Sequence, residues 1–347
     1  MRVVRFHAPG DVRIEEVAEP APSPGDVMIR VRACSTCGTD VKISKFGHHH
    51  IVPPRVMGHE IAGEIVEVGG EVAGDWRVGD RVQVIAAIPC GTCGECRRGR
   101  MTVCTRQESM GYHYDGGFAQ FMVVPAKVLV VGGLNRIPDG LSFAEASVAE
   151  PLACVLNGQE LARVGAGDDV VVIGSGPIGC LHVRLARARG AERVFLVDIN
   201  TERLNLAAGL VAPDAAIDGG HTDAVDEVRK LTDGRGADVI VTAAASGAAQ
   251  EQALLMAAPH ARISFFGGLP KDNPVIACDS NLVHYRELTI VGANGSSPNH
   301  NAEAVRLIAA GAVPVADLIT LRLPLERALE AFDAVARGTA IKVTVEP

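Results

Sequence analysis

Four cysteines lie within a fifteen-residue segment of the sequence, in the spacing C-x2-C-x2-C-x7-C. Four thiolates this close together can form a closed tetrahedral shell around zinc, with no coordination position left for a substrate. An iron–sulfur cluster is the competing metal site, and an unligated cysteine-rich loop is the alternative without a metal. The intervening glycine, arginine and threonine residues are typical of an exposed lobe that a metal would stabilise, which favours structural zinc on Cys90, Cys93, Cys96 and Cys104.

A second set of potential metal ligands is dispersed along the chain. It comprises Cys37 in the segment Cys37-Gly-Thr-Asp40, the pair His59-Glu60, and Glu150. One thiolate, one imidazole and one or two carboxylates fit a catalytic zinc, which keeps a position open for water or substrate. A lone cysteine and a His-Glu pair are more often structural, so spacing alone leaves the catalytic zinc as a hypothesis.

A glycine-rich turn predicts a dinucleotide site. The apolar run 170–173 precedes the turn and a helical stretch follows it, which is the context that a G-x-G-x-x-G motif requires. The first glycine permits the tight turn, the second lets the backbone approach a pyrophosphate, and the third lets the helix pack against the strand. The residues expected at the cofactor are Gly174, Gly176, Pro177, Ile178 and Gly179.

An acidic residue after the next apolar run indicates which dinucleotide binds. Asp198 follows the last glycine by about 20 residues, the spacing at which a carboxylate reaches the ribose hydroxyls of the adenosine. The same carboxylate would repel a 2′-phosphate, so NAD is favoured over NADP. Arg203 either covers the adenine ring or is a solvated charge on a helix. A glycine turn in an unrelated α/β protein is the alternative.

The elements that must position these residues are of two kinds. Up to about residue 150, short apolar runs alternate with proline and glycine turns, which predicts a β-rich, barrel-like domain. From residue 169, apolar strands alternate with helical stretches such as 178–189, which predicts a doubly wound parallel sheet. After about residue 293 we expect two helical segments and a closing strand that return to the first domain. The predicted fold class is α/β.

Composition excludes several classes of function. The 347 residues suit two domains, and 48% hydrophobic with 21% charged residues is typical of a globular protein. A net charge of −8 without a basic run argues against a nucleic-acid partner. No apolar run could span a bilayer and no signal peptide is evident, so we expect a cytoplasmic protein without disulfides. Four further cysteines are expected to be buried: Cys34, Cys154, Cys180 and Cys278.

The order of these motifs resembles the zinc-dependent medium-chain dehydrogenases/reductases, in particular the branch of polyol (sorbitol/L-iditol) and threonine dehydrogenases. The resemblance covers nearly the whole chain. It implies a discontinuous GroES-like zinc catalytic domain formed by residues 1–152 and 294–347, and a Rossmann NAD-binding domain over 153–293. It also implies two zinc ions per chain, NAD as cofactor, a small-molecule alcohol as substrate, no membrane partner, and self-association to a tetramer or dimer.

The resemblance further implies roles for individual side chains. Thr39 would accept the proton of the alcohol, and Asp40 would orient a zinc-binding imidazole. Lys42 stands where many relatives have a histidine that relays the proton to water, and it could do so only with a lowered pKa. The catalytic zinc ligands would be Cys37, His59, Glu60 and Glu150, the last bound directly or through water.

The resulting hypothesis is the reversible oxidation of a secondary alcohol of a polyol, cyclitol or sugar derivative to a ketone. Sorbitol-type members carry an arginine in the segment that corresponds to 292–296 and an aromatic residue near Ile43; both are absent, so a strict sorbitol dehydrogenase is disfavoured. Threonine-dehydrogenase-like oxidation of an amino alcohol is the alternative within the enzyme class. A non-catalytic, zinc-stabilised regulator that binds NAD(H) is the alternative from another class, but it has no need of an open metal site.

Two polar, aromatic segments could contact a substrate. The histidine run 48–50 fits an exposed loop, a substrate contact or a metal site. The segment 112–115, with two tyrosines, a histidine and an aspartate, fits either a substrate contact or an ordinary turn.

Overall fold

The computed structural model describes residues 1–347, which divide into two compact units. Unit 1 comprises Met1–Ala153 and Gly295–Pro347, and unit 2 comprises Cys154–Asn294. The chain therefore leaves unit 1, completes unit 2 and then returns to finish unit 1. None of the helices is long and apolar enough to cross a membrane.

Unit 1 is built around a seven-stranded sheet in which the strands follow the order β10-β6-β5-β3-β18-β17, with β9 also paired to β3. The antiparallel pair of β3 (Val27–Ser35) and β5 (Glu60–Val68) places Ser35 opposite Glu60. Along the first part of β3 alternate residues are buried, as expected for a strand with one face on a core. The other strands are β6 (Arg81–Val84), β9 (Phe121–Val124), β10 (Leu134–Arg136), β17 (Ile319–Pro324) and β18 (Lys342–Glu346).

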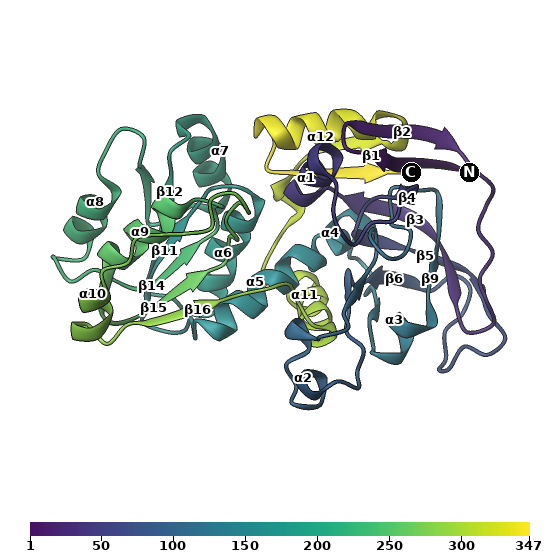
Figure 1. Ribbon diagram of the computed structural model, residues 1–347, viewed down its shortest axis with the longest axis horizontal. Helices are drawn as coiled ribbons and strands as arrows, with labels where there is room; N and C mark the ends of the chain where they lie inside the picture. The colour runs from purple at the N-terminus through teal and green to yellow at the C-terminus, as the bar shows by residue number, and fades with distance from the viewer. The chain divides into compact units, whose positions relative to one another are not determined.

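Strand β18 inserts residues 342–346 between β3 and the edge strand β17 of this sheet. It pairs in parallel with β17 and antiparallel with β3. The hydroxyl oxygen of Ser35 lies 2.6 Å from that of Ser147 and 2.9 Å from that of Thr344, so three distant segments share one buried chain of hydroxyl groups. Helix α12 (Ala328–Arg337), in yellow in Figure 1, contacts β18, and β1 (Arg2–Ala8) and β2 (Asp11–Glu16) form the purple hairpin of the same view.

Shorter elements complete unit 1. Strand β4 (Arg55–Val56) extends the β1–β2 hairpin, and β7 (Ala87–Ile88) pairs with β8 (Glu108–Ser109). Helix α5 (Ala149–Leu161) carries the chain from unit 1 into unit 2. The other helices of unit 1 are α1 (Gly38–Phe46), α2 (Gly94–Arg97), α3 (Ala126–Val130), α4 (Phe143–Ser147) and α11 (Pro298–Ala309).

Unit 2 is a six-stranded, fully parallel sheet in the order β13-β12-β11-β14-β15-β16. All five residues of β11 (Asp169–Ile173) are buried, and after Asp169 the strand is an unbroken apolar run, as expected for a parallel strand covered on both faces. The strand order reverses between β11 and β14, and dinucleotides bind at such a reversal in doubly wound sheets. The strands are β11 (Asp169–Ile173), β12 (Arg193–Asp198), β13 (Ala215–Asp218), β14 (Ala237–Thr242), β15 (Ala257–Phe265) and β16 (Thr289–Gly292).

Helices connect the successive strands of unit 2, and the predicted α/β class is confirmed (Figure 1). Helix α6 (Pro177–Ala188) follows β11, and eight consecutive residues of it, from Gly179 to Ala186, are buried. The other helices are α7 (Thr201–Val211), α8 (Ala224–Leu231), α9 (Gly247–Met256) and α10 (Ser280–Tyr285).

One expectation about the cysteines is wrong. Cys34 and Cys180 are buried and Cys154 is partly buried, but Cys278 is exposed. It lies between β15 and α10, in a segment without strand or helix, where its neighbours are mostly exposed. A short apolar run in the sequence was therefore not sufficient to place the thiol in a core.

Candidate active site

Cys37, His59 and Glu60 converge within unit 1. Their potential ligand atoms all lie within 4.8 Å of one another. Cys37 follows β3 and caps the start of α1, while His59 and Glu60 lie at the start of β5. Because β3 ends where its antiparallel partner β5 begins, the residue two positions beyond β3 meets the first residues of β5. His59 and Glu60 are buried, and Cys37 is partly exposed.

The turn before His59 requires a glycine. Gly58 has a φ of +95°, which side chains rarely adopt. A Cβ atom at this position would lie 2.7 Å from Sγ of Cys34 and 2.9 Å from the ring of Phe118. Any side chain at residue 58 would therefore displace the turn that delivers His59 to the site.

The donor set fits a zinc ion. A thiolate, an imidazole and a carboxylate are ligands of catalytic zinc sites. Oε1 of Glu60 is buried without a hydrogen-bond or ion-pair partner. Burial of a carboxylate oxygen without such a partner is costly, and a bound cation offsets that cost. The chemistry of the set and this unsatisfied oxygen therefore agree with the predicted metal.

Asp40 lies beside His59, as predicted from the sequence. Its Oδ1 atom is 3.3 Å from Nδ1 of His59, an ion-pair distance without hydrogen-bond geometry, and its Oδ2 atom accepts the backbone N–H of Cys37 at 2.8 Å. Burial acts to lower the pKa of His59, but attraction to the Asp40 carboxylate outweighs it and raises that pKa well above its usual value. Since Asp40 contacts Nδ1, the nitrogen available to a metal is Nε2.

The structure adds a residue that sequence reasoning missed. The ammonium group of Lys342 forms an ion pair with Oε2 of Glu60 and donates to the backbone oxygen of Thr36 at 2.9 Å. Both charged side chains are about 2% exposed or less. Burial raises the pKa of Glu60 to about 7, although the charge of Lys342 lowers it. The only sign of this ion pair in the sequence was a single lysine within the largely apolar closing strand.

The other predicted residues lie around this set. The hydroxyl oxygen of Thr39 is 3.5 Å from Sγ of Cys37. Glu150 is buried in the first turn of α5 and lies outside the group that converges within 4.8 Å, yet its charge raises the pKa of Glu60. Lys42 is exposed on α1.

Aromatic and imidazole rings extend from His59 along one side of the site. The ring centroid of Tyr112 is 6.0 Å from that of His59 and 5.0 Å from that of His48, with the second pair edge to face. Those of His50 and His113 are 5.0 Å apart. Burial raises the pKa of Tyr112 to about 12, so its hydroxyl stays protonated near neutral pH.

The four-cysteine lobe is a second potential metal site in unit 1, with all four sulfur atoms within 4.8 Å of one another. Backbone N–H groups donate to the sulfurs, from Cys93 to Cys90 at 3.3 Å and from Cys96 to Cys93 at 3.5 Å. The second of these donors is the main cause that lowers the pKa of Cys93 to about 5, whereas burial raises that of Cys96 to about 12. The lobe offers four closely spaced sulfurs and fits a structural zinc.

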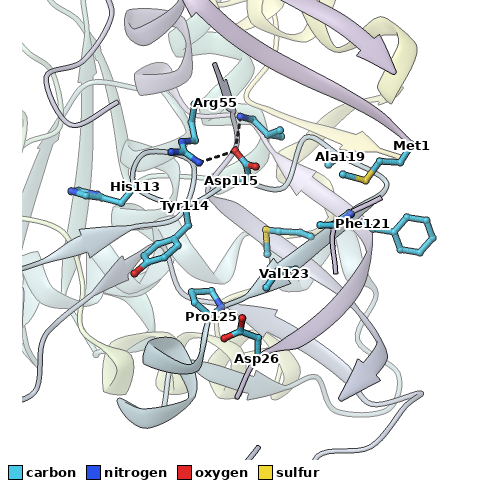
Figure 2. A pocket seen from close by; sticks show the side chains of 14 residues that line it. Met1, Asp26, Arg55, His113, Tyr114, Asp115, Ala119, Phe121, Val123 and Pro125 are labelled. Atoms are coloured by element: carbon cyan, nitrogen blue, oxygen red, sulfur yellow. Dashed lines mark hydrogen bonds and ion pairs between the residues drawn. The ribbon is translucent and has the colours of Figure 1, made fainter. Parts of the chain in front are cut away.

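These two sets are the groups of three or more potential ligands that converge this closely, and the histidine run 48–50 is not among them. A cavity of about 280 Å³ in unit 1 also lies apart from both sets, because none of their ligands lines it. Its charged groups are already paired. Arg55 contacts Asp115 at 3.0 Å, as Figure 2 shows, and Asp26 accepts the backbone N–H of Ala126 at 2.8 Å.

In unit 2 the glycine turn has the close approach that its sequence predicts. A Cβ atom at Gly179 would lie 1.8 Å from the backbone oxygen of Gly174, so only glycine lets α6 pack this close to β11. Helix α6 begins at Pro177, and its N-cap Gly176 has no side chain to occupy the first backbone N–H groups. Such a bare helix N-terminus is suited to a phosphate.

Asp198 ends β12 and is buried beside this turn. Its Oδ2 atom accepts hydrogen bonds from the backbone N–H and the hydroxyl of Ser175, both at 2.7 Å, and from Arg203 at 2.9 Å. Burial acts to raise the pKa of Asp198, but hydrogen bonds from backbone N–H groups and the charge of Arg203 lower it. The carboxylate therefore stays ionised, and Arg203 offsets part of its charge.

Comparison with known proteins assigns both units of the chain to one family. Residues 23–136 match the alcohol dehydrogenase GroES-like domain, and residues 177–310 match the zinc-binding dehydrogenase domain. L-threonine 3-dehydrogenase of Pyrococcus furiosus is 36% identical over 333 residues, with 94% of this chain and 93% of that protein covered. Sorbitol dehydrogenase of Halalkalibacterium halodurans is 31% identical over 346 residues, with 98% and 97% covered.

A solved structure extends the likeness to three dimensions. It is described as a zinc-binding dehydrogenase from Sinorhizobium meliloti 1021 bound to NADP, and it matches with a TM-score of 0.91 and 31% identity over 100% of this chain and 99% of that one. The chain thus belongs to the zinc-dependent medium-chain dehydrogenases, in the branch of the polyol and threonine dehydrogenases. It is an NAD-dependent alcohol dehydrogenase, with zinc and NAD as cofactors and a small alcohol as substrate.

Proposed function

We propose that this enzyme oxidises a secondary alcohol of a polyol, cyclitol or sugar derivative to a ketone, and catalyses the reverse reduction. The observation that carries the proposal is the convergence of Cys37, His59 and Glu60, whose potential ligand atoms all lie within 4.8 Å of one another. These residues would hold the catalytic zinc, with Glu150 as an additional ligand directly or through water. A second zinc on the four-cysteine lobe would have a structural role only.

When bound, zinc acidifies the alcohol and NAD accepts the hydride. The side chains of the protein then have two tasks. Thr39, whose hydroxyl lies 3.5 Å from Sγ of Cys37, accepts the proton of the alcohol while it releases its own to solvent. Asp40 holds the orientation of the His59 ring through Nδ1. Lys42 is exposed on the same helix as Thr39, whereas a relay would require a buried lysine, so it is assigned no step.

Oxidation of an amino alcohol is the second candidate. Its support is the 36% identity to an L-threonine 3-dehydrogenase over 94% of the chain, a higher identity than that to the sorbitol dehydrogenase. The zinc ligands and the hydride transfer would be the same for both substrate classes. The difference would lie in the side chains that bind the remainder of the substrate.

The proposed cofactor site consists of the glycine turn 174–179, Asp198 and Arg203. A carboxylate at residue 198 would bind the ribose hydroxyls of NAD and repel a 2′-phosphate. Replacement of Asp198 by alanine should leave Arg203 free of its partner and lower the NAD over NADP ratio of kcat/KM by about 10-fold or more. An unaltered ratio would show that another group sets the preference.

Metal analysis and a substrate panel test the proposal together. The purified protein should contain two zinc ions per chain and form NADH with at least one polyol or cyclitol. Turnover of L-threonine alone would favour the second candidate. A protein that retains both zinc ions and forms NADH with neither class would contradict both.

A further inference from the structure

Tyr112 lies in a loop that packs against the turn before His59. The loop follows β8, and two of its glycines make the close approach possible. A Cβ atom at Gly111 would lie 2.9 Å from the backbone oxygen of Gly58, and a Cβ atom at Gly116 would clash with the same oxygen. Backbone contact therefore holds Tyr112 beside the turn that delivers His59 to the candidate site.

Several charges of the candidate site act on the hydroxyl of Tyr112. Burial is the main cause that raises the pKa of Tyr112. The charge of His59 lowers that pKa, and further increases come from three negatively charged groups, those of Asp40, Cys37 and Glu150. Such effects weaken with distance, so the phenol oxygen lies in the same electrostatic neighbourhood as these four side chains. The 6.0 Å between the ring centroids of Tyr112 and His59 agrees with this position.

The hydroxyl of Tyr112 has no hydrogen-bond partner in the protein. A tyrosine with a largely buried ring usually finds a partner for its hydroxyl. The oxygen does not belong to the fully buried polar atoms that lack a partner, so it remains accessible to a ligand. The nearby Tyr114 differs, because its hydroxyl donates to Oε2 of Glu108 at 2.8 Å. The protein thus satisfies one tyrosine of this loop and leaves the other available.

We propose that Tyr112 is a substrate-binding residue, whose hydroxyl forms a hydrogen bond with a polar group of the bound alcohol other than the oxygen that is oxidised. This role rests on the proposed dehydrogenase function. The proposed zinc ligands and Thr39, which serve the oxidised oxygen, come mainly from the ends of β3 and β5 and from α1. Tyr112 comes from a separate loop, so it can hold the remainder of the substrate and orient the reacting carbon. A phenol hydroxyl both donates and accepts, so either kind of polar group can be its partner.

Tyr112→Phe removes the hydroxyl and keeps the ring. We would compare two diols with their matched alcohols, 1,2-propanediol with 2-propanol and 1,3-butanediol with 2-butanol. For at least one diol, KM should rise by about 5-fold or more with kcat within about 2-fold, because one hydrogen bond to the substrate is lost. For the matched alcohol, both constants should stay within about 2-fold of the wild type. Equal changes for a diol and its alcohol, or no change for either diol, would overturn the role of Tyr112.

Tyr114→Phe is the matched control from the same loop. It also removes a phenol hydroxyl, but one whose partner is Glu108. Its unfolding temperature can fall, whereas KM and kcat for the diols should stay within about 2-fold of the wild type. A selective loss for the diols in Tyr114→Phe as large as that in Tyr112→Phe would show that order in the loop is the cause, and would overturn a direct contact by Tyr112.

A binding measurement separates failure of this contact from failure of the proposed reaction. The chain contains three tyrosines, so a carbon-13 label on the ζ carbon gives three resonances, which the phenylalanine variants assign. In the zinc-loaded protein without NAD, 1,2-propanediol or 1,3-butanediol should shift the resonance of Tyr112 saturably. The resonances of Tyr114 and of Tyr285, which is exposed at the end of α10, should not move.

The two possible failures give different results. A saturable shift at Tyr112 in a protein that oxidises no alcohol would refute the reaction and leave Tyr112 as a ligand contact. Oxidation of a diol without any shift at Tyr112 would refute the contact and leave the reaction in place.

Discussion

The two metal-ligand sets of unit 1 are assembled in opposite ways. The sulfurs of the four-cysteine lobe come from one short segment, and backbone N–H groups of that same segment donate to them. Cys37, His59 and Glu60 come from the ends of two paired strands and are supported by Asp40 and by Lys342, which lies near the end of the chain. The lobe is thus a local structure, whereas the set of Cys37, His59 and Glu60 depends on the register of the paired strands β3 and β5.

Because of this difference, we expect substitutions in the lobe to change mainly the stability of the protein, and substitutions in the set of Cys37, His59 and Glu60 to change mainly its activity. A local loop with four thiolates gains its order from the metal, so its loss should be visible mainly in unfolding. A set that the folded sheet already positions should lose metal and activity without loss of the fold. Each of the following substitutions tests one part of this contrast.

The largest effect is expected for Cys37→Ser. Loss of this proposed zinc ligand should remove several kcal/mol of transition-state stabilisation, so kcat/KM should fall by about 10⁴-fold or more. Zinc content should fall from two ions to one, while the unfolding temperature changes little. The exposed Cys278→Ser is the matched control and should alter none of these quantities. Retention of both zinc ions in Cys37→Ser would remove the catalytic-zinc assignment.

Lys342→Met should have the next largest effect. It leaves the buried carboxylate of Glu60 without its cationic partner, which typically costs about 3–5 kcal/mol of folding free energy. Denaturant unfolding of the metal-free protein measures the loss. The double variant Glu60→Gln with Lys342→Met should recover part of it, since no unpaired charge remains. Equal stability of the single and double variants would show that the ion pair is not the cause.

Cys93→Ser should act on the lobe alone. Loss of the structural zinc is expected to cost about 3 kcal/mol, which corresponds to roughly 6–12 °C in unfolding temperature for a domain of this size. Calorimetry and metal analysis would measure both quantities. The zinc that remains should still support turnover at low temperature. Unchanged stability and two retained zinc ions would refute the structural role.

The smallest effect is expected for Asp40→Asn. The amide keeps the shape of the side chain but removes the negative charge beside Nδ1 of His59, and such outer partners are typically worth about 10–100-fold in activity or metal affinity. Zinc titration followed by kinetics would separate the two contributions. An activity equal to that of the wild type would mean that the sheet alone orients His59.

The sequence predicted the parts of the molecule whose chemistry is local. The glycine turn, its preceding strand and the acidic end of the next strand lie within one contiguous segment, and the predicted parallel sheet is confirmed. The spacing of the four cysteines likewise predicted that their sulfur atoms converge, without reference to any distant segment. The second ligand set was weak by spacing and became specific only through the order of motifs that the family shares.

What the sequence did not predict depends on contacts between distant segments. Lys342 meets Glu60 only because β18 inserts beside β3, and no pattern near either residue specifies that pairing. The approach of His50 to His113 likewise joins two loops that are separate in sequence. Cys278 was misplaced because its exposure is set by the lack of a strand or helix around it.

The position of β18 between β3 and the edge strand β17 has a consequence for synthesis on the ribosome. Domains generally fold as units while the chain emerges. Unit 2 can complete its sheet once residue 294 is available, but the main sheet of unit 1 lacks a strand between β3 and β17 until residues 342–346 have emerged. Residues 1–153 therefore leave β3 without its partner β18 while residues 154–294 complete their own sheet.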